Sequence, residues 1–262
     1  MSDGTRAAMS ETAAERNLRL LVEYDGTAYC GWQFQENGPS IQAELLRALE
    51  GLTGQRPVIS VAGRTDAGVH AVGQVASLRI VSRVPTRRFA SALNSQLPND
   101  ISVHRVDEMP SSFDARHSAH SKRYRYRIYQ GSEPAALEPR AWYRRRPLAV
   151  APMREAAALL IGEHDFESFR SVHCDAPHAR RRMLDITLDE QERPPVGRTL
   201  DIVFHANAYC RHMCRILTGT LVDVGRGRKT PSDVARVLEA RDRTLAGLTA
   251  PPRGLTLLEV LY

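Results

Sequence analysis

The chain has 262 residues, and its hydrophobic content of 42% excludes an intrinsically disordered protein and allows one large domain or two of ordinary size. Its 36 basic and 30 acidic residues leave a formal charge of +6, which favours a polyanionic partner. Four cysteines in a chain of this length exclude a disulfide framework and match the reducing conditions of the cytoplasm.

The first half of the chain alternates predicted strands and helices after a polar tail. Residues 1–16 are expected to be disordered and lack the apolar run of a signal peptide. Helices are predicted at residues 41–52, where Ser40 can cap the start and Gly54 the end, and at residues 86–97, which Pro98 stops. Strands are predicted at residues 18–23, 58–62, 73–80 and 101–106.

The second half repeats this mixture, so the predicted fold class is α+β. Gly225 is expected to follow one helix as its C′ residue, and Thr230 is expected to cap the next, with Asp233 in the capping-box position. The predicted helices cover residues 152–161, 208–224 and 231–240, and the predicted strands cover residues 122–129, 183–188, 199–205 and 255–261.

A break near Pro110 and Ser111 divides the chain into two predicted α/β subdomains, residues 17–112 and residues 113–262. No segment approaches the ~20 apolar residues of a membrane span, so we expect a cytoplasmic protein without membrane association.

The loop from Gly63 to Ala71 contains the strongest candidate for chemistry. It places Asp66 between Arg64 and Gly68, in a segment too broken for a helix or a strand. Glycines permit backbone turns that other residues avoid, so the loop can present the carboxylate to a substrate. The alternative is a tight turn in which Asp66 caps a backbone amide and Arg64 is solvated.

Nearly all of the cationic charge is arginine, because Lys122 and Lys229 are the only lysines. Guanidinium groups suit bidentate contacts to phosphate and stacking on bases, although arginine-rich codon usage would give the same composition. These groups form either an extended RNA-binding groove or a set of solvated loops. The basic clusters lie at residues 87–88, 122–127, 144–146, 180–182 and 226–229.

The segment Lys122–Ile128 alternates in a way that is typical of a strand with one buried face. Tyr124 and Tyr126 fall on the same face as Ile128, and the arginines between them fall on the other. The pattern alone is equally consistent with tyrosines that only fill the core.

The predicted helix at residues 208–224 contributes two further observations. Arg211 and Arg215 are four residues apart and would form a basic edge, and Arg215 is expected to be half-buried with a carboxylate partner. Cys210, His212 and Cys214 have the spacing of metal ligands, but on a helix His212 would point away from both cysteines, so no metal site is predicted.

The chain resembles the tRNA pseudouridine synthases of the TruA type, in order and from about Leu18 to Tyr262. The motifs that carry the resemblance are Glu23–Thr27, Gly31–Gln33, Gly63–Ala71, Asn94, Leu97–Pro98, Phe113–Arg116, Lys122–Tyr126, Gly162–Phe166, Ser168–Arg170, Met213–Arg215, Asp242–Thr244 and Gly254–Leu255. This resemblance implies two α/β subdomains joined through a largely antiparallel mixed central sheet flanked by helices.

The same resemblance implies an isomerase that converts uridine to pseudouridine at positions 38 to 40 of the tRNA anticodon stem-loop. It identifies Asp66 as the catalytic nucleophile, Tyr124 as the tyrosine packed against the target base, and Arg215 as the cation paired with the aspartate. Arg64 is expected to bind the substrate by filling the space of a flipped-out uridine or holding its phosphate. The family works without metal or small-molecule cofactor, and as a homodimer in which one tRNA contacts both subunits.

This sequence departs from the family pattern at three cysteines. Cys210 and Cys214 replace bulkier apolar residues and Cys30 replaces an aromatic residue, so the packing behind Arg215 and near Trp32 is expected to differ. The alternative function is a catalytically silent tRNA-binding protein in which Asp66 only shapes its loop. A metal-dependent nuclease is disfavoured, because no acidic pair has ligand spacing around Asp66.

Overall fold

The structure of this protein, a computed structural model, describes residues 14–195 and 197–262. Residues 1–13 of the predicted tail lie outside the described residues. The first strand begins at Glu15, so the last two residues of that tail, Glu15 and Arg16, are extended.

The described residues form one ten-stranded sheet with the order β4-β1-β3-β10-β5-β9-β8-β7, in which β2 pairs with β3 and β6 with β5. All neighbours are antiparallel except β10 with β3 and β6 with β5. This sheet confirms the predicted α+β fold with a largely antiparallel mixed sheet. The strands are β1 (Glu15–Tyr24), β2 (Ile59–Val61), β3 (His70–Val81), β4 (Ile101–Met109), β5 (Ser121–Gln130), β6 (Trp142–Arg144), β7 (Gly162–Asp165), β8 (Arg180–Arg193), β9 (Gly197–Ala206) and β10 (Leu255–Leu261).

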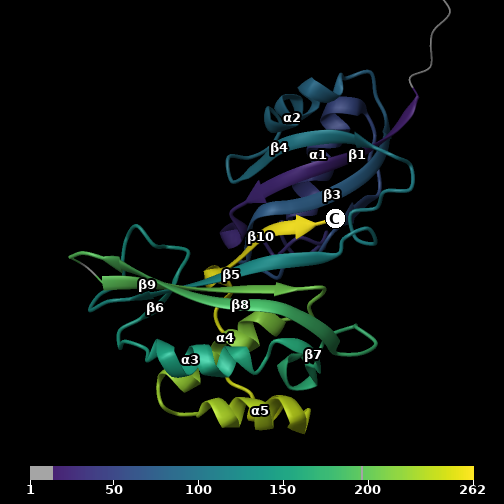
Figure 1. Cartoon of the computed structure of the whole chain (residues 1–262). Coiled ribbons are helices and arrows are strands. Elements are labelled where there is room, and N and C mark those ends of the chain that lie inside the picture. Colours follow the sequence, from purple (N-terminus) through teal and green to yellow (C-terminus); the bar gives the residue numbers. More distant parts are fainter. Residues whose placement is uncertain (1–13, 196) are drawn as a thin grey trace, which may run out of the picture.

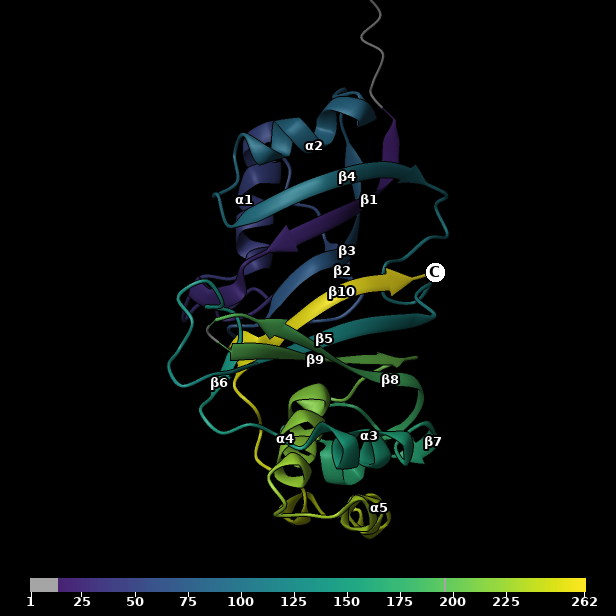
Figure 2. The same cartoon turned by 60° about the vertical axis from the view of Figure 1, so that its left-hand side comes forward.

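The helices gather in two groups, one on each half of the sheet (Figures 1 and 2). The first group lies beside β4, β1 and β3, and the second beside β5, β9 and β8. The last strand, β10, lies between β3 and β5 and joins the halves. The groups are α1 (Ile41–Thr53) with α2 (Thr86–Asn94), and α3 (Val150–Ala158) with α4 (Met213–Gly225) and α5 (Pro231–Ala240). In the part of the chain that is described, no helix is both long and apolar enough to cross a membrane.

Local capping signals place the ends of α1 and α5 where the sequence predicts them. Ser40 accepts the backbone N–H of Ala43 at the start of α1, and Gly54 ends that helix with φ 72°. Thr230 and Asp233 form the predicted capping box of α5. The prediction was wrong for α2, which ends at Asn94 before the predicted residue 97, and for α3, which covers residues 150–158 and not 152–161.

Helix α4 differs from its predicted extent at both ends. It begins at Met213 and not at residue 208, because His212 adopts the left-handed conformation with φ 64° and breaks the helical path. Arg211 therefore lies outside the helix and forms no basic edge with Arg215. At the other end Gly225 belongs to the helix, and the left-handed glycine is Gly227, with φ 69°.

Strand β5 has the predicted two faces. Tyr124, Tyr126 and Ile128 are buried in the core that the two halves share. On the opposite face Arg127 forms a bidentate ion pair with Asp201 of β9, at 2.6 and 2.8 Å. Arg123 forms an ion pair with Glu259 of β10 through a single contact, from Nη1 to Oε1. Neighbouring strands therefore neutralise much of this basic cluster.

Two other basic clusters meet at the far end of α4. Burial, followed by the positive charges of Arg226 and Arg228, lowers the pKa of Arg144. Residues 144–146, Arg226 and Arg228 thus form one cationic surface, which we call the β6–α4 basic surface.

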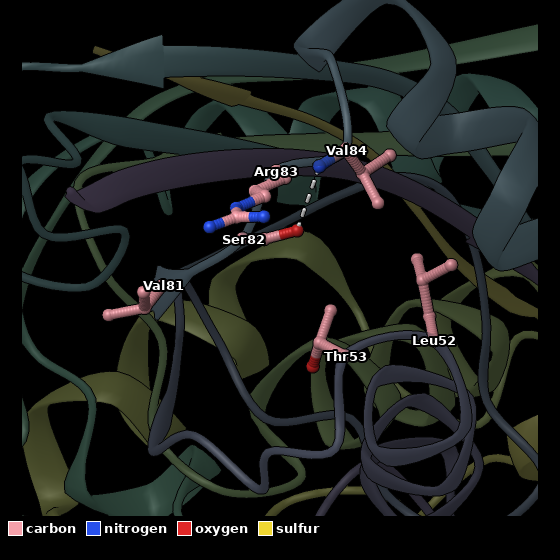
Figure 3. A pocket seen from close by; sticks show the side chains of 6 residues that line it. All are labelled: Leu52, Thr53, Val81, Ser82, Arg83 and Val84. Carbon is pink, nitrogen blue, oxygen red and sulfur yellow. Dashed lines mark hydrogen bonds between the residues drawn. The ribbon is translucent and has the colours of Figure 1, made fainter. Parts of the chain in front are cut away.

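The cavity in Figure 3 has a volume of about 420 Å³ and lies between the end of α1 and the connection from β3 to α2. It is lined by Leu52, Thr53 and residues 81–84, and Ser82 Oγ accepts the N–H of Val84 across it at 3.1 Å. It lies at the opposite end of β3 from the loop that carries Asp66, which is roughly 35 Å of extended chain away.

Candidate active site

The loop between β2 and β3 carries Asp66, and hydrogen bonds from β1 and β3 hold the loop in place. Thr65 is buried, and its Oγ1 shares a hydrogen bond of 2.8 Å with the hydroxyl of Tyr24, at the end of β1. Gln74 of β3 donates to the same hydroxyl at 3.2 Å and to the carbonyl of Gly63 at 2.8 Å. These bonds hold the residues on the N-terminal side of Asp66 in place.

A second segment packs directly on the backbone of this loop. The N–H of Trp32 donates to the carbonyl of Thr65 at 3.1 Å, and the N–H of Gly68 donates to the carbonyl of Tyr29 at 3.3 Å. Gly31 makes this approach possible, because it has φ 100° and a Cβ there would lie 2.6 Å from the Thr65 carbonyl oxygen.

His70 completes the support on the C-terminal side of the loop. Its Nδ1 accepts the N–H of Gly26 at 3.1 Å, and its Nε2 lies 3.2 Å from the carbonyl of Arg253. Burial lowers the pKa of His70, and the charge of Asp25, whose Oδ1 lies 3.0 Å from Nδ1, opposes this shift. The histidine therefore connects the turn after β1 to the segment that leads into β10.

The carboxylate of Asp66 meets Arg215, 149 residues later in the chain. Arg215 lies in the first turn of α4, its side chain is 13% exposed, and its Nη1 is 3.3 Å from Asp66 Oδ2. Its Nε donates to the carbonyl of Ala250 at 2.8 Å, and the N–H of Ala250 donates back to the Arg215 carbonyl at 3.1 Å. The predicted carboxylate partner of Arg215 is therefore Asp66.

His212, which the sequence analysis considered only as a metal ligand, also belongs to the site. Its Nε2 lies 3.5 Å from Asp66 Oδ2, the oxygen that Arg215 also contacts. Burial lowers the pKa of His212; the charge of Asp66 opposes this shift and the nearby arginines reinforce it. The signal in the sequence is the spacing of His212 and Arg215, which are three residues apart and would share one face of the helix predicted at residues 208–224.

Tyr124 approaches the base of the loop from β5. The residue is 7% exposed, and its ring meets that of Tyr209 edge-on with centroids 5.0 Å apart. A Cβ on Gly63 would lie 3.5 Å from the Tyr124 hydroxyl. Burial, reinforced by neighbouring acidic groups that include Asp66, raises the pKa of Tyr124 well above its usual value, so the hydroxyl remains protonated.

The remaining basic residues near the loop differ in exposure. Arg64 is exposed and, among the described residues, has no hydrogen-bond or ion-pair partner. Lys122 is only 9% exposed, and a Cβ on Gly63 would lie 3.3 Å from its Cε. Burial, followed by the charge of Arg116, lowers the pKa of Lys122. Arg64 therefore projects to the surface, and Lys122 packs beneath the loop.

The cysteines behind Arg215 act as small apolar residues. Cys210 and Cys214 are both buried in the main core, and burial raises the pKa of each thiol. Cys30 is exposed. The packing behind Arg215 therefore remains apolar in spite of the substitutions.

The site thus brings together one carboxylate, one arginine, one histidine and one protonated tyrosine from separated segments of the chain. Arg215 and His212 both approach Oδ2, so the other carboxylate oxygen can attack an electrophilic carbon.

Comparison with known proteins gives consistent matches over most of the chain. A family model described as tRNA pseudouridine synthase matches residues 20–118 and 156–262, which include Asp66 and Arg215. A protein named tRNA pseudouridine synthase A from Geotalea daltonii is 42% identical over 248 residues, which cover 94% of this chain and 100% of that protein. One of the same name from Myxococcus xanthus is 44% identical over 246 residues, covering 94% and 91% of the two chains.

Proposed function

This chain belongs to the tRNA pseudouridine synthase family, and we propose that it converts uridine to pseudouridine at positions 38 to 40 of the tRNA anticodon stem-loop, with Asp66 as the nucleophile. The observation that carries the role of Asp66 is its ion pair with Arg215, which joins a glycine-bounded loop to the start of α4. Arg215 compensates the negative charge of the Asp66 carboxylate. One oxygen of that carboxylate remains accessible to the substrate.

The reaction is an isomerisation and needs no net oxidation. The bond from N1 to C1′ breaks, the uracil rotates within the site, and a bond from C5 to C1′ forms. The proton on C5 is released and N1 gains one. Asp66 can add to C6 of the uracil or support departure at C1′, and both routes use the carboxylate that Arg215 contacts.

Tyr124 is assigned to the target base. Its protonated hydroxyl and its ring, beside the Asp66 loop, suit packing against the uracil and hydrogen bonding to it. The raised pKa argues against a phenolate that would act as general base at C5.

Arg64 is assigned to the flipped-out nucleotide. A uridine in a stem-loop has to leave its stack to reach Asp66, and the exposed guanidinium next to the nucleophile can fill the vacated space or hold the phosphate.

We assign part of the contact with the tRNA phosphates to the β6–α4 basic surface, where residues 144–146 lie near Arg226 and Arg228. This surface lies at the end of α4 remote from Arg215, roughly 20 Å away along a 13-residue helix. A homodimer that shares one tRNA is part of the proposal on the strength of the family resemblance.

Release of tritium from tRNA labelled at uridine C5 tests the function. Wild-type protein should release tritium from the labelled tRNA. A transcript with cytidine in place of uridine at position 38, 39 or 40 should release less tritium, by the amount that this position contributes. Asp66→Asn should bind tRNA and release none, while Asp189→Asn, on the exposed surface of β8, should match wild type.

Two results would overturn the proposal. Wild-type release by Asp66→Asn would remove the nucleophile assignment. Binding of tRNA without release by the wild type would instead establish the silent tRNA-binding protein.

A further inference from the structure

His212 is the one residue beside Asp66 whose backbone is strained, and we propose that it is a positioning residue for the nucleophile. In this role His212 and Arg215 together hold Oδ2 of Asp66, so that Oδ1 is the oxygen that reacts with the substrate. The inference rests on the proposed function, because it assigns a task within the same site.

The backbone of His212 directs its ring toward the loop. Its φ of 64° and ψ of 1° lie in the left-handed region, which costs a residue with a Cβ more than it costs glycine. The residue precedes α4 as its N-cap, yet its side chain makes no capping hydrogen bond to the helix. Side-chain capping therefore does not account for the conformation, and the same backbone places the ring within 3.5 Å of Asp66 Oδ2.

The charges around His212 suit a neutral donor. Asp66, Arg215, Arg211 and Arg243 are the charged groups that act on the ring, so His212 lies near one negative and three positive charges. A fourth positive charge would add repulsion, but a neutral imidazole adds a hydrogen-bond donor without charge. The lowered pKa of His212 agrees with the neutral form at pH 7.

The contacts of the Asp66 carboxylate show which of its two oxygens is held in place. Arg215 and His212 both contact Oδ2, and among the described residues Oδ1 accepts no hydrogen bond. The 3.5 Å from His212 Nε2 is longer than a hydrogen bond, and catalytic contacts of this kind tighten when substrate fills the site. Two donors on one oxygen prevent the carboxylate from rotating and exchanging its oxygens.

The test compares three substitutions at this position. His212→Gly removes the ring and relaxes the backbone, so a loss of activity cannot come from new strain. His212→Asn also tolerates the left-handed backbone, but its amide is too short to reach Asp66. His212→Gln restores an N–H near the position of Nε2. Arg241→Gly is the matched control, because Arg241 is the other described non-glycine residue with positive φ, at 52°.

The readouts are the single-turnover rate of tritium release, the Kd for tRNA and the urea midpoint of unfolding. His212→Gly and His212→Asn should lower the rate by about 10- to 100-fold with Kd within about 2-fold of wild type. His212→Gln should recover most of that loss, and Arg241→Gly should keep the wild-type rate.

A wild-type rate in His212→Gly would overturn the inference, as would a glutamine variant no faster than the glycine variant. A loss confined to Kd would make His212 an RNA contact and would overturn it too. Failure of the proposed function is distinguishable, because the wild-type protein itself would then release no tritium.

Discussion

Tyr24 and Thr65, 41 residues apart, share a buried hydrogen bond of 2.8 Å that ties the end of β1 to the residue preceding Asp66. Burial raises the pKa of Tyr24 to about 12, although the bonds with Thr65 and Gln74 act in the opposite direction, so the hydroxyl stays protonated. The position of the proposed nucleophile therefore depends on a polar contact inside the core.

Tyr24→Phe should reduce both stability and turnover. The substitution leaves the buried groups of Thr65 and Gln74 with one partner fewer, which should cost about 1–3 kcal/mol in the free energy of unfolding. Urea unfolding and the rate of tritium release measure the two effects. Tyr143→Phe, which removes an exposed bond to the Ser132 carbonyl, is the control and should change little. Wild-type values for Tyr24→Phe would show that the loop does not need this anchor.

Gly31→Ala should damage the site through its backbone. The new Cβ would lie 2.6 Å from the Thr65 carbonyl oxygen at a residue with φ 100°, so strain and a steric clash add together. Gly54→Ala is the matched control, because Gly54 has φ 72° and nothing within 4 Å of the added Cβ. We expect the control to lose about 1–2 kcal/mol in unfolding free energy and Gly31→Ala to lose more, together with its turnover. Equal losses would remove the clash from the explanation.

Arg215→Leu should lower turnover far more than tRNA affinity. The substitution removes the cation that faces Asp66 and leaves the carboxylate half-buried without its ion pair. We expect single-turnover rates at least about 100-fold lower and a Kd for tRNA close to wild type. Arg236→Leu, at an exposed position on α5, should be neutral in both measurements. A loss of affinity with an unchanged rate would reassign Arg215 to a phosphate contact.

The β6–α4 basic surface should contribute affinity without affecting the chemical step. Replacing Arg145 and Arg226 together by glutamine should weaken tRNA binding, and should reduce the slope of log Kobs against log salt by about 1 for each phosphate that is no longer neutralised. Arg127→Gln is the charge control, since Asp201 neutralises Arg127 across β5 and β9. Salt-dependent filter binding gives both slopes. An unchanged slope in the double variant would exclude this surface from the tRNA footprint.

Stability should fall as the pH drops below about 6.5. Burial lowers the pKa of His70 in the folded chain, so near pH 6 the unfolded chain binds a proton that the folded chain does not. The stabilisation is complete above the unfolded pKa and is lost progressively as the pH decreases from that value through the lower folded pKa. Urea midpoints at pH 7.5 and 5.5 measure the loss, which should be smaller in His70→Gln.

The pH dependence that remains in His70→Gln belongs to His205 and His212, because burial lowers the pKa of each of these residues too. An unchanged pH dependence in that variant would show that His70 is not protonated differently in the folded and unfolded chains.

Short-range patterns predicted the elements whose causes are local. The Ser40 cap and the Gly54 end of α1, the capping box of α5 and the two faces of β5 all depend on residues within a few positions of one another. The loop around Asp66 was recognisable for the same reason, because glycines and a turn-forming aspartate interrupt any regular repeat.

The family resemblance pointed to Arg215 as the partner of Asp66, and the tertiary structure added His212 and decided how the two residues meet the carboxylate. Arg215 and His212 approach it because β10 inserts between β3 and β5, and this places the start of α4 near a loop 149 residues earlier in the chain. Helical spacing predicted that α4 starts at residue 208, but the left-handed backbone at His212 delays its start to Met213 and turns that ring toward the carboxylate. Periodicity indicates a residue's neighbours within one element. The partners of Asp66 come from other elements, so their positions follow from the order in which the strands pair.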